Sequence, residues 1–411
     1  MALDGIYLSF LVSKVNELLK GAKVDKIHQP SKNELVFIMR TKGGMHKLYF
    51  SADANSPRFS VVEKTPENPQ TPPMLCMLFR KKLTSATLVS VEQYGLDRIA
   101  FFNFDATNDI GDRVKLTLAV EIMAQHSNVI LINEDNRIVD ALKRVDAEKS
   151  SYRLVLPGAE YKLPPPQEKL DLRECEPSAV CEAVLGLTNA KLSSAILKTI
   201  QGVSPLVSRE IAYRVSGDDK AVADLCADEK MKLLCEICDL KSMLINEKCE
   251  PMMVLDASEK PMEFSFMPIK QYGESFKAIV KPDVFSLLEG FYSERDRLSR
   301  TRSKAAELFK MLENCIERTA RKLNNQQEDL DKCADRESIR INAELVTAAQ
   351  YRLQKGASVY EVENYYDNNS IVKITVDPAL TPSQNAQRLY KEYHKACKAE
   401  DMLIKLIEEN L

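Results

Sequence analysis

A long helix is predicted from about Val284 to about Arg340, and the apolar residues that repeat along it at seven-residue spacing constrain the fold more than any other feature of the sequence. Two parallel tracks at this spacing are the two seams of a coiled coil. About 55 helical residues at 1.5 Å each make a rod of roughly 80 Å, which is too long for one compact core. The tracks consist of Phe291, Leu298, Ala305 and Leu312, and of Leu288, Phe309, Ile316, Leu323 and Leu330.

A second heptad segment predicts the other half of an antiparallel pair. It runs from Ala386 to Ile407 and can return along the first helix. Residues 284–411 are therefore expected to form a coiled-coil arm, with a compact tip at about 341–382 in which Tyr365, Tyr366, Ile371 and Ile374 pack. The sequence stops within the returning helix without a capping glycine, so we expect that a C-terminal part is missing.

The first 170 residues predict a strand-rich head. An amphipathic helix over Asp4–Leu19 is followed by short β-type segments separated by Pro, Gly, Lys and Asn turns, and a second helix spans Met74–Leu83. The stretch "LPGAEYKLPPPQEKLD" reads as a linker, because its prolines fit neither regular element. The fold class expected for the whole chain is α+β with several domains.

Residues 171–250 predict a helical module of the helix-hairpin-helix type. Its centre is Ala195–Val215, where one helix stops at Gly202 and the next begins at Pro205. The backbone N–H groups of such a turn, at Gly202 and Ser204, can point at a phosphate, although a plain helical hairpin has the same sequence pattern. A small β connector is expected over 251–283.

The composition excludes several classes of protein. With 60 acidic and 57 basic residues the net charge is −3, so the chain cannot coat nucleic acid through overall basicity and would need local patches. No stretch of 18 apolar residues or signal peptide is found, which predicts a cytoplasmic protein with reduced thiols and no membrane partner.

Cys235 and Cys238 lack two further zinc ligands and are interpreted as small core residues. No metal or cofactor is expected.

Asp97 and Arg98 are opposite charges placed side by side where the strand "RIAFFNF" begins. Taken alone, the pair reads equally well as a solvated strand end. Other stretches, however, accompany it in a fixed order, among them "DGIYLSFLVSKVNELL", "PPMLCMLFRKKL", "VEIMAQHSNVIL", "QGVSPLVSREI" and "VDPALTPSQNAQ". Together they resemble the NFACT family of ribosome-associated quality-control factors, of the bacterial RqcH type, formerly called fibronectin-binding protein A.

The resemblance covers essentially the whole chain and implies a function. Members of this type recognise a large (50S) ribosomal subunit blocked by a nascent chain on peptidyl-tRNA. They recruit alanine tRNA for template-free alanine tailing, while the ribosome itself performs peptidyl transfer. The protein is therefore expected to be a recruiting factor without catalytic residues, and the family's C-terminal NFACT-R domain is expected to be absent. The head is expected to resemble the N-terminal domain of formamidopyrimidine-DNA glycosylases.

The resemblance also implies residue roles. The family's Asp-Arg motif maps onto Asp97 and Arg98, and its N-terminal Asp-Gly onto Asp4 and Gly5, which makes these candidate tRNA contacts. Arg98 could pair with a phosphate or stack on a base, and Asp97 could accept from base amines or hold Arg98.

The family's Glu-Ile-Met motif maps onto Glu121, Ile122 and Met123, as candidate tRNA or ribosome contacts. Glu121 would suit a base edge, whereas Ile122 and Met123 are more often core residues. His126 could be an RNA contact or a buried histidine. Where many members have arginine this chain has Gln125, which removes one phosphate contact. Arg80, Lys81 and Lys82 are further candidate phosphate contacts, or simply a solvated face.

Three other functions are each compatible with part of the sequence. A DNA glycosylase of the formamidopyrimidine type needs an N-terminal proline, but Ala2 and Leu3 occupy the second and third positions, so no DNA partner is expected. A fibronectin-binding surface adhesin would need an export signal or wall anchor. A generic coiled-coil scaffold explains residues 284–411 but not the ordered motifs of the head.

Overall fold

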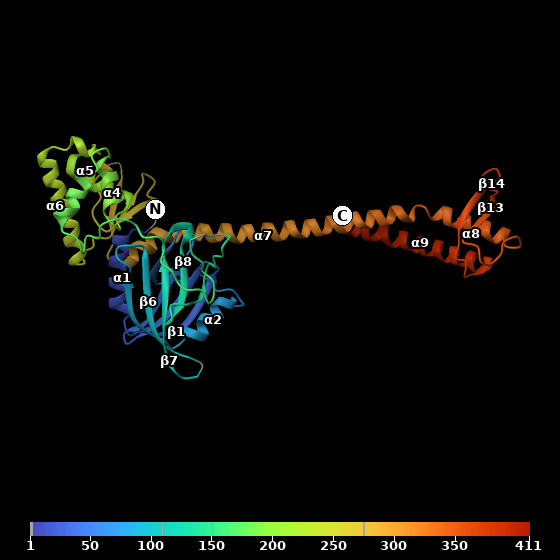
Figure 1. Cartoon of the computed structure of the whole chain (residues 1–411), viewed down its shortest axis with the longest axis horizontal. Coiled ribbons are helices and arrows are strands. Elements are labelled where there is room, and N and C mark those ends of the chain that lie inside the picture. The colour runs from blue at the N-terminus through green and yellow to red at the C-terminus, as the bar shows by residue number, and fades with distance from the viewer. Residues whose placement is uncertain (1–2, 109, 149, 151, 274–275) are drawn as a thin grey trace. The chain divides into compact units, whose positions relative to one another are not determined.

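The computed structural model describes residues 3–108, 110–148, 150, 152–273 and 276–411 (Figure 1). The chain divides into two compact units, Met1–Ser299 and Arg300–Leu411. In the described part of the chain, no helix is both long enough and apolar enough to cross a membrane. The finer division predicted from the sequence, at 170, 250 and 283, stays a prediction.

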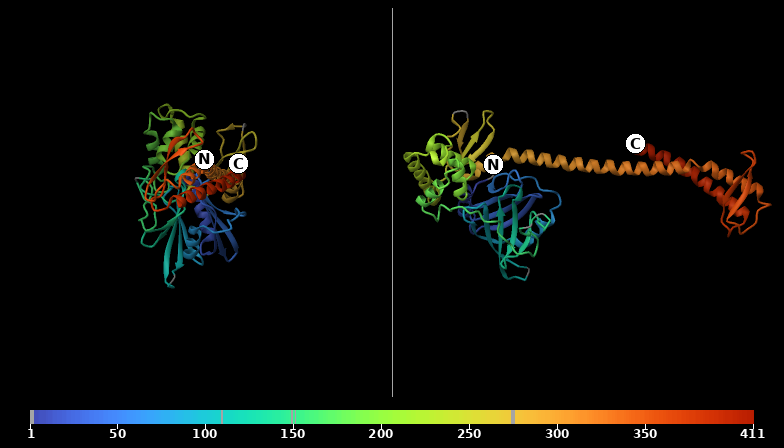
Figure 2. Two further views of the ribbon diagram at one scale, coloured as in Figure 1. Left: turned by 90° about the vertical axis from the view of Figure 1, so that its right-hand side faces the viewer. Right: turned by 45° about the horizontal axis from the view of Figure 1, so that its top comes forward.

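The first unit is built on a nine-stranded sheet in which all neighbouring strands are antiparallel. The sheet curves strongly around its core (Figure 2). Apolar side chains alternate along the strands, so that Leu35, Phe37 and Met39 face the core from a single strand. The strand order is β4-β3-β2-β1-β5-β6-β7-β8-β9. The bounds are β1 Lys23–Ser31, β2 Glu34–Thr41, β3 Gly44–Ser51, β4 Arg58–Val62, β5 Thr87–Gln93, β6 Ile99–Thr107, β7 Arg113–Glu121, β8 Asn128–Asn133 and β9 Ile138–Ala141.

Two helices complete the head, as predicted. Helix α1 (Gly5–Leu19) begins at Asp4, whose carboxylate accepts the N–H of Tyr7 at 2.7 Å and so caps the first turn. Helix α2 (Met74–Leu83) fills the opening where β1 separates from β5, which pair only at Lys23 and Thr87. It inserts Phe79 into the core, and Arg80 Nε donates to the carbonyl of Ile27 at 2.7 Å. The predicted strand-rich head is confirmed.

Four helices form the module after the head: α3 (Pro177–Leu185), α4 (Leu192–Thr199), α5 (Pro205–Ser216) and α6 (Ala227–Ile245). The predicted helix-hairpin-helix is α4, a five-residue turn and α5. Gly202 in the turn has φ +79°, which glycine adopts without strain, and Ser204 caps α5 by accepting the N–H of Val207 at 3.3 Å.

Cys235 and Cys238 are exposed on α6, so their interpretation as core residues is wrong. The apolar stripe of α6 consists of Leu233, Ile237, Leu240 and Leu244, and the two cysteines lie off that stripe. All ten cysteines are free.

The first turns of α7 (Val284–Cys333) are held against the head by a buried polar cluster. Arg58 on β4 donates to Asp296 at 2.5 Å, and its guanidinium lies between the rings of Tyr49 and Tyr292, 4.9 and 4.4 Å from their centroids. Tyr7 of α1 donates to the carbonyl of Val284 at 3.0 Å. A three-stranded sheet of β10 (Met252–Leu255), β11 (Pro261–Ser265) and β12 (Lys277–Val280) lies in the same unit.

The second unit contains the rest of α7, then α8 (Arg336–Ala349), the hairpin β13 (Val359–Asn364) and β14 (Ser370–Thr375), and α9 (Pro382–Asn410). Helix α9 returns antiparallel to α8 and to the last turns of α7, as Asn410 donates to Gln326 at 3.2 Å. The single helix predicted to about residue 340 is interrupted at 334–335, so α8 is a separate helix. The antiparallel helical arm is confirmed.

Two expectations for this unit need correction. Of the side chains predicted to pack in the tip, only Ile374 is buried, because Ile371 lies on the opposite face of its strand and Tyr365 and Tyr366 follow the end of β13. On α7, Phe309 and Ile316 are exposed, at 66% each, although they belong to the predicted seam. Asn410 reaches only as far as Lys322, so no described helix faces those turns.

Three backbone segments meet at closest range beside the start of α1. The N–H groups of Gly5 and Ile6 both donate to the carbonyl of Gly202, at 2.9 and 3.2 Å. A Cβ on Gly5 would lie 1.9 Å from the carbonyl oxygen of Leu96, and one on Gly202 would lie 2.8 Å from the same atom. The head, its β5–β6 hairpin and the helical module therefore join through glycines that no larger residue can replace. We call this contact of Gly5, Leu96 and Gly202 the glycine junction.

We predict that Gly5→Ala destabilises the first unit by about 3 kcal/mol, because the added methyl group overlaps backbone that cannot move away. Gly43→Ala is the control, since the nearest atom to its new Cβ lies 3.8 Å away. The measurement is the unfolding midpoint of both variants in urea. Equal midpoints for Gly5→Ala and the unchanged protein would contradict the account of the junction.

Candidate functional site

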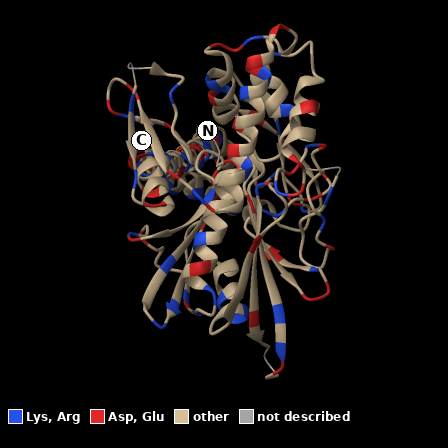
Figure 3. Cartoon of the chain, turned by 90° about the vertical axis from the view of Figure 1, so that its left-hand side faces the viewer, with Lys and Arg blue, Asp and Glu red and all other residues tan. Residues whose placement is uncertain are grey.

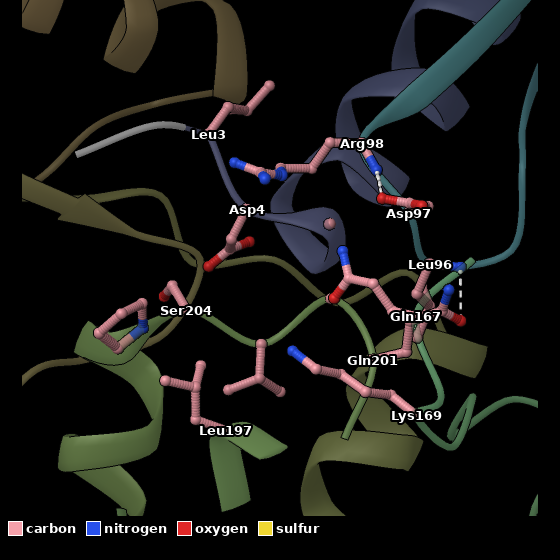
Figure 4. Close-up of a pocket in the computed structure, with 14 residues that line it drawn as sticks. Leu3, Asp4, Leu96, Asp97, Arg98, Gln167, Lys169, Leu197, Gln201 and Ser204 are labelled. Carbon is pink, nitrogen blue, oxygen red and sulfur yellow. Dashed lines mark hydrogen bonds between the residues drawn. The ribbon is translucent and has the colours of Figure 1, made fainter. Parts of the chain in front are cut away.

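The glycine junction forms one wall of a pocket with a cavity volume of about 220 Å³ (Figure 4). Its lining comes from four places in the chain: the start of α1, the β5–β6 hairpin, the linker after the head and the α4–α5 turn. Six of the residues singled out from the sequence line this one pocket, namely Asp4, Gly5, Asp97, Arg98, Gly202 and Ser204.

Asp97 and Arg98 occupy different positions in this pocket. Asp97 is 7% exposed, and its Oδ1 accepts the backbone N–H of Arg98 at 2.7 Å. Arg98 is half-buried, and its side chain extends into the pocket toward Asp4 (Figure 4). In the described ranges of the chain, no carboxylate lies within 4 Å of its guanidinium. Asp97 therefore fixes the backbone, while Arg98 presents a charge that can bind a ligand.

The carboxyl of Asp4 is the acid that faces Arg98 across this space. Burial raises its pKa from 3.8 to about 6, against the opposing effects of the Tyr7 N–H, the hydroxyl of Ser204 and the charge of Arg98. Near neutral pH the Asp4 carboxyl is therefore ionised, although burial removes part of its hydration and disfavours the charged form.

A second cation, missed from the sequence, enters the pocket from the linker. Lys169 follows the three prolines 164–166, and its side chain points to the same space (Figure 4). Burial, with the nearby charge of Arg98, lowers the pKa of Lys169. Gln167 and Gln201 also line the pocket, and Gln201 Oε1 accepts the N–H of Leu96 at 3.4 Å. Only folding brings the linker here, so no local sequence pattern could have identified Lys169.

Glu121 is not exposed to a ligand. It is 1% exposed and accepts from Arg153 Nη1 at 2.7 Å, in a two-pronged ion pair, and from the hydroxyl of Tyr161 at 3.0 Å. Burial and the Glu121 charge raise the pKa of Tyr161. Glu121 lies opposite Ile99 in the β6–β7 ladder, one residue from Arg98, so it supports the strand that carries the Asp97–Arg98 pair.

The other residues of that motif, and His126 after it, divide between core and surface. Ile122 is fully buried, and its N–H donates to the carbonyl of Arg98 at 2.9 Å. Met123 is half-buried. His126 is exposed on a short 3₁₀ turn over Ala124–His126, beside the amide of Gln125 at 3.0 Å. None of these side chains lines the pocket, so the motif contacts the strand of the Asp97–Arg98 pair without adding a side chain to the pocket.

The basic run on α2 also lies apart from the pocket. Arg80 is half-buried and bonded to the carbonyl of Ile27, whereas Lys81 is exposed and Lys82 half-buried. In the described part of the chain, no group of three or more His, Cys, Asp or Glu side chains is placed to hold a metal ion. Ala2, which decided against the glycosylase reading, lies outside the described residues.

The arrangement of the pocket suits a ligand that carries both a negative group and polar edges. Arg98 and Lys169 can bind a phosphate oxygen. The Asp4 carboxylate can accept hydrogen bonds from the ligand, and the two glutamine amides can both donate and accept. The first turn of α5 faces the same space. One nucleotide of an RNA has this combination of groups.

The chain belongs to the NFACT family, since the family described as NFACT N-terminal and middle domains matches residues 4–411. It is 32% identical over 398 residues to a Bacillus subtilis protein named Rqc2 homolog RqcH, covering 96% of this chain and 67% of that protein. A Streptococcus pneumoniae protein of the same name is 30% identical, covering all of this chain and 69% of the relative.

Two solved structures are similar as well. One is described as the fibrinogen binding protein from Staphylococcus aureus, with 25% identity, a TM-score of 0.60, and coverage of 71% of this chain and 99% of that one. The other is the N-terminal part of the fibronectin/fibrinogen-binding protein from Streptococcus suis, with 25% identity, a TM-score of 0.58, and coverage of 71% and 100%. Both support the α+β fold of the first unit.

We predict that Asp4→Asn changes the dependence of stability on pH. A carboxyl whose pKa rises on folding contributes its full stability below the unfolded value of 3.8 and loses it as the pH rises through about 6. The loss is at most about 3 kcal/mol. Asparagine keeps the cap of α1 without the charge. The variant should therefore match the unchanged protein near pH 4 and exceed it in unfolding free energy at pH 8.

Urea unfolding at pH 4, 6 and 8 measures this difference. Asp283→Asn is a suitable control, because Asp283 caps the start of α7 from an exposed position. A difference between Asp4→Asn and the unchanged protein that stays constant with pH would show that the Asp4 carboxyl is not destabilised by burial.

We further predict that Glu121→Ala costs about 3 kcal/mol of stability, because it leaves the half-buried charge of Arg153 without its buried partner. Arg98→Ala should cost less than about 1 kcal/mol, since its guanidinium has no ion pair with any residue that the structure describes. Thermal unfolding of the two variants compares them directly. The opposite order would make Glu121 the accessible residue and Arg98 the structural one.

Proposed function

We propose that this protein is a ribosome-associated quality-control factor that binds obstructed large ribosomal subunits and recruits alanine tRNA for template-free alanine tailing of the stalled chain. In this proposal it has no covalent active site, and the ribosome performs peptidyl transfer. It works in the cytoplasm, where ribosomes are. The observation that carries the proposal is the convergence of Asp4, Asp97, Arg98 and the α4–α5 turn on one pocket.

The chemistry of the pocket supports an RNA ligand. Arg98 and Lys169, which have no carboxylate partner among the described residues, would bind a backbone phosphate, and Arg98 could do so through two parallel N–H groups. The Asp4 carboxylate and the amides of Gln167 and Gln201 would accept from and donate to the edge of an unpaired base, which is how proteins commonly read RNA.

Membership in the NFACT family and the names of the curated relatives support the ribosomal part of the proposal. The partners would be the 50S subunit, its peptidyl-tRNA-linked nascent chain and alanine tRNA. The four-part division at residues 170, 250 and 283 would then give separate modules for tRNA and for the subunit. No DNA or membrane partner is part of this proposal.

A second candidate function is binding of fibronectin or fibrinogen. It rests on the descriptions of the two similar solved structures. Surface plasmon resonance with immobilised fibronectin tests it. Binding that survives Arg98→Ala but is lost on removal of residues 300–411 would assign it to a surface other than the pocket.

We expect the double change Asp97→Ala/Arg98→Ala to weaken binding of alanine tRNA by 10-fold or more, because it removes both the phosphate-binding group and the acceptor that fixes its backbone. Arg98→Lys should recover little of this affinity, since an ammonium group lacks the two-pronged geometry. Arg113→Ala, at the exposed start of β7, is the matched control. Filter binding measures all four proteins, and equal affinities would remove the pocket from the proposal.

A further inference from the structure

A second positively charged region lies on the outer face of the sheet, away from the pocket. Between residues 20 and 47 the sequence contains seven Lys or Arg and two acidic residues, in a chain whose net charge is −3. One of the two acids, Glu34, is buried and accepts from the hydroxyl of Tyr49 at 2.5 Å. The strands in the lower part of Figure 3 carry blue segments of this kind.

The strand register places these cations on one face. Lys23 lies directly opposite Arg40, and Arg40 lies opposite Met45 on β3. One step along, Lys26 and Lys47 flank Ile38 from the two neighbouring strands. The alternate residues of β2 (Leu35, Phe37 and Met39) are buried in the core, so this row points outward.

This placement runs against sheet stability. Like charges directly opposite each other on neighbouring strands destabilise the pair, yet Lys23 and Arg40 are so placed and both are exposed. Among the residues described, no carboxylate lies within 4 Å of Lys23, Lys26 or Arg40. Asp25 sits at a β-bulge between Val24 and Lys26 and makes no ion pair there. The repulsion between these cations is not offset by a neighbouring carboxylate in the described part of the chain. We take this as a sign that a ligand supplies the opposite charge.

Helix α2 extends the region. Arg80 is fixed at the edge of β1 by its bond to the Ile27 carbonyl, and Lys82 follows on the same helix. Burial, and after it the charges of Arg80 and Lys26, lower the pKa of His28, so these two cations lie near its ring. Toward the other end of this face, α7 covers Tyr49 and Arg58, so the region ends there.

We propose that Lys23, Lys26, Arg40, Lys47 and Arg80 form a docking face for the phosphate backbone of a structured RNA, separate from the pocket. The choice of RNA rests on the proposed function, whereas the positive charge of the face does not. Several cations along three strands and a helix match a repeated negative charge better than they match a single anion. Binding at this face reads the backbone rather than the sequence, and the pocket adds specificity.

The test compares three full-length variants by fluorescence anisotropy on a labelled RNA duplex of about 20 base pairs and on alanine tRNA. The first is Lys23→Gln/Lys26→Gln/Arg40→Gln, and the second is Arg98→Ala. The control, Lys230→Gln/Lys232→Gln/Lys248→Gln, removes three exposed charges from the helical module. Thermal unfolding verifies folding, and the first variant should be at least as stable as the unchanged protein because a like-charge pair is removed.

We expect the first variant to reduce the slope of log affinity against log salt by about 2–3 on both RNAs, because each lost phosphate contact lowers the slope by about 0.7–0.9. The other two variants should leave the slope on the duplex unchanged. An unchanged slope for the first variant, or an equal loss in the control, overturns the docking face. So does weakened binding to vesicles with phosphatidylserine while RNA binding persists. An Arg98→Ala variant with full affinity for alanine tRNA contradicts the proposed function instead.

Discussion

The glycine junction is the contact on which the rest of the first unit depends. One carbonyl, that of Gly202, accepts the first two N–H groups of α1, which no earlier turn of the helix can satisfy. Because Leu96 O would lie 1.9 Å from a Cβ on Gly5, the three segments touch backbone to backbone. This contact sets the separation of the head and the helical module, and so gives the pocket its walls.

The elements of the fold could be predicted from the sequence because their signals are local. Strand alternation, turn residues and the Gly202–Pro205 hairpin all act over a few residues. Sequence patterns gave a wrong prediction where the burial of a side chain depends on which other element packs against it. Phe309 and Ile316 follow a perfect heptad spacing and are nevertheless exposed, because periodicity says which side chains share a face and not what lies opposite.

In the candidate site, too, the local motifs were predictable from the sequence and their arrangement in space was not. The sequence identifies Asp97, Arg98 and the hairpin turn as separate motifs, and no pattern in it indicates that they line one pocket. Lys169 carries no motif and reaches the pocket only through the fold. Glu121 belongs to a recognisable motif, but its carboxylate is occupied by Arg153. The motifs therefore identified residues in and around the pocket. They did not distinguish the side chains that can contact a ligand, such as Arg98, from those that stabilise the strand, such as Glu121.

The desolvation of the Asp4 carboxyl has a consequence for ligand capture. A carboxyl with a pKa of about 6 is already part-protonated at slightly acidic pH. A phosphate arriving beside it adds a negative charge and raises that pKa further, so association takes up hydrogen ions from the buffer. The heat of association would then vary with the ionisation enthalpy of the buffer, and calorimetry in two buffers would count the protons taken up.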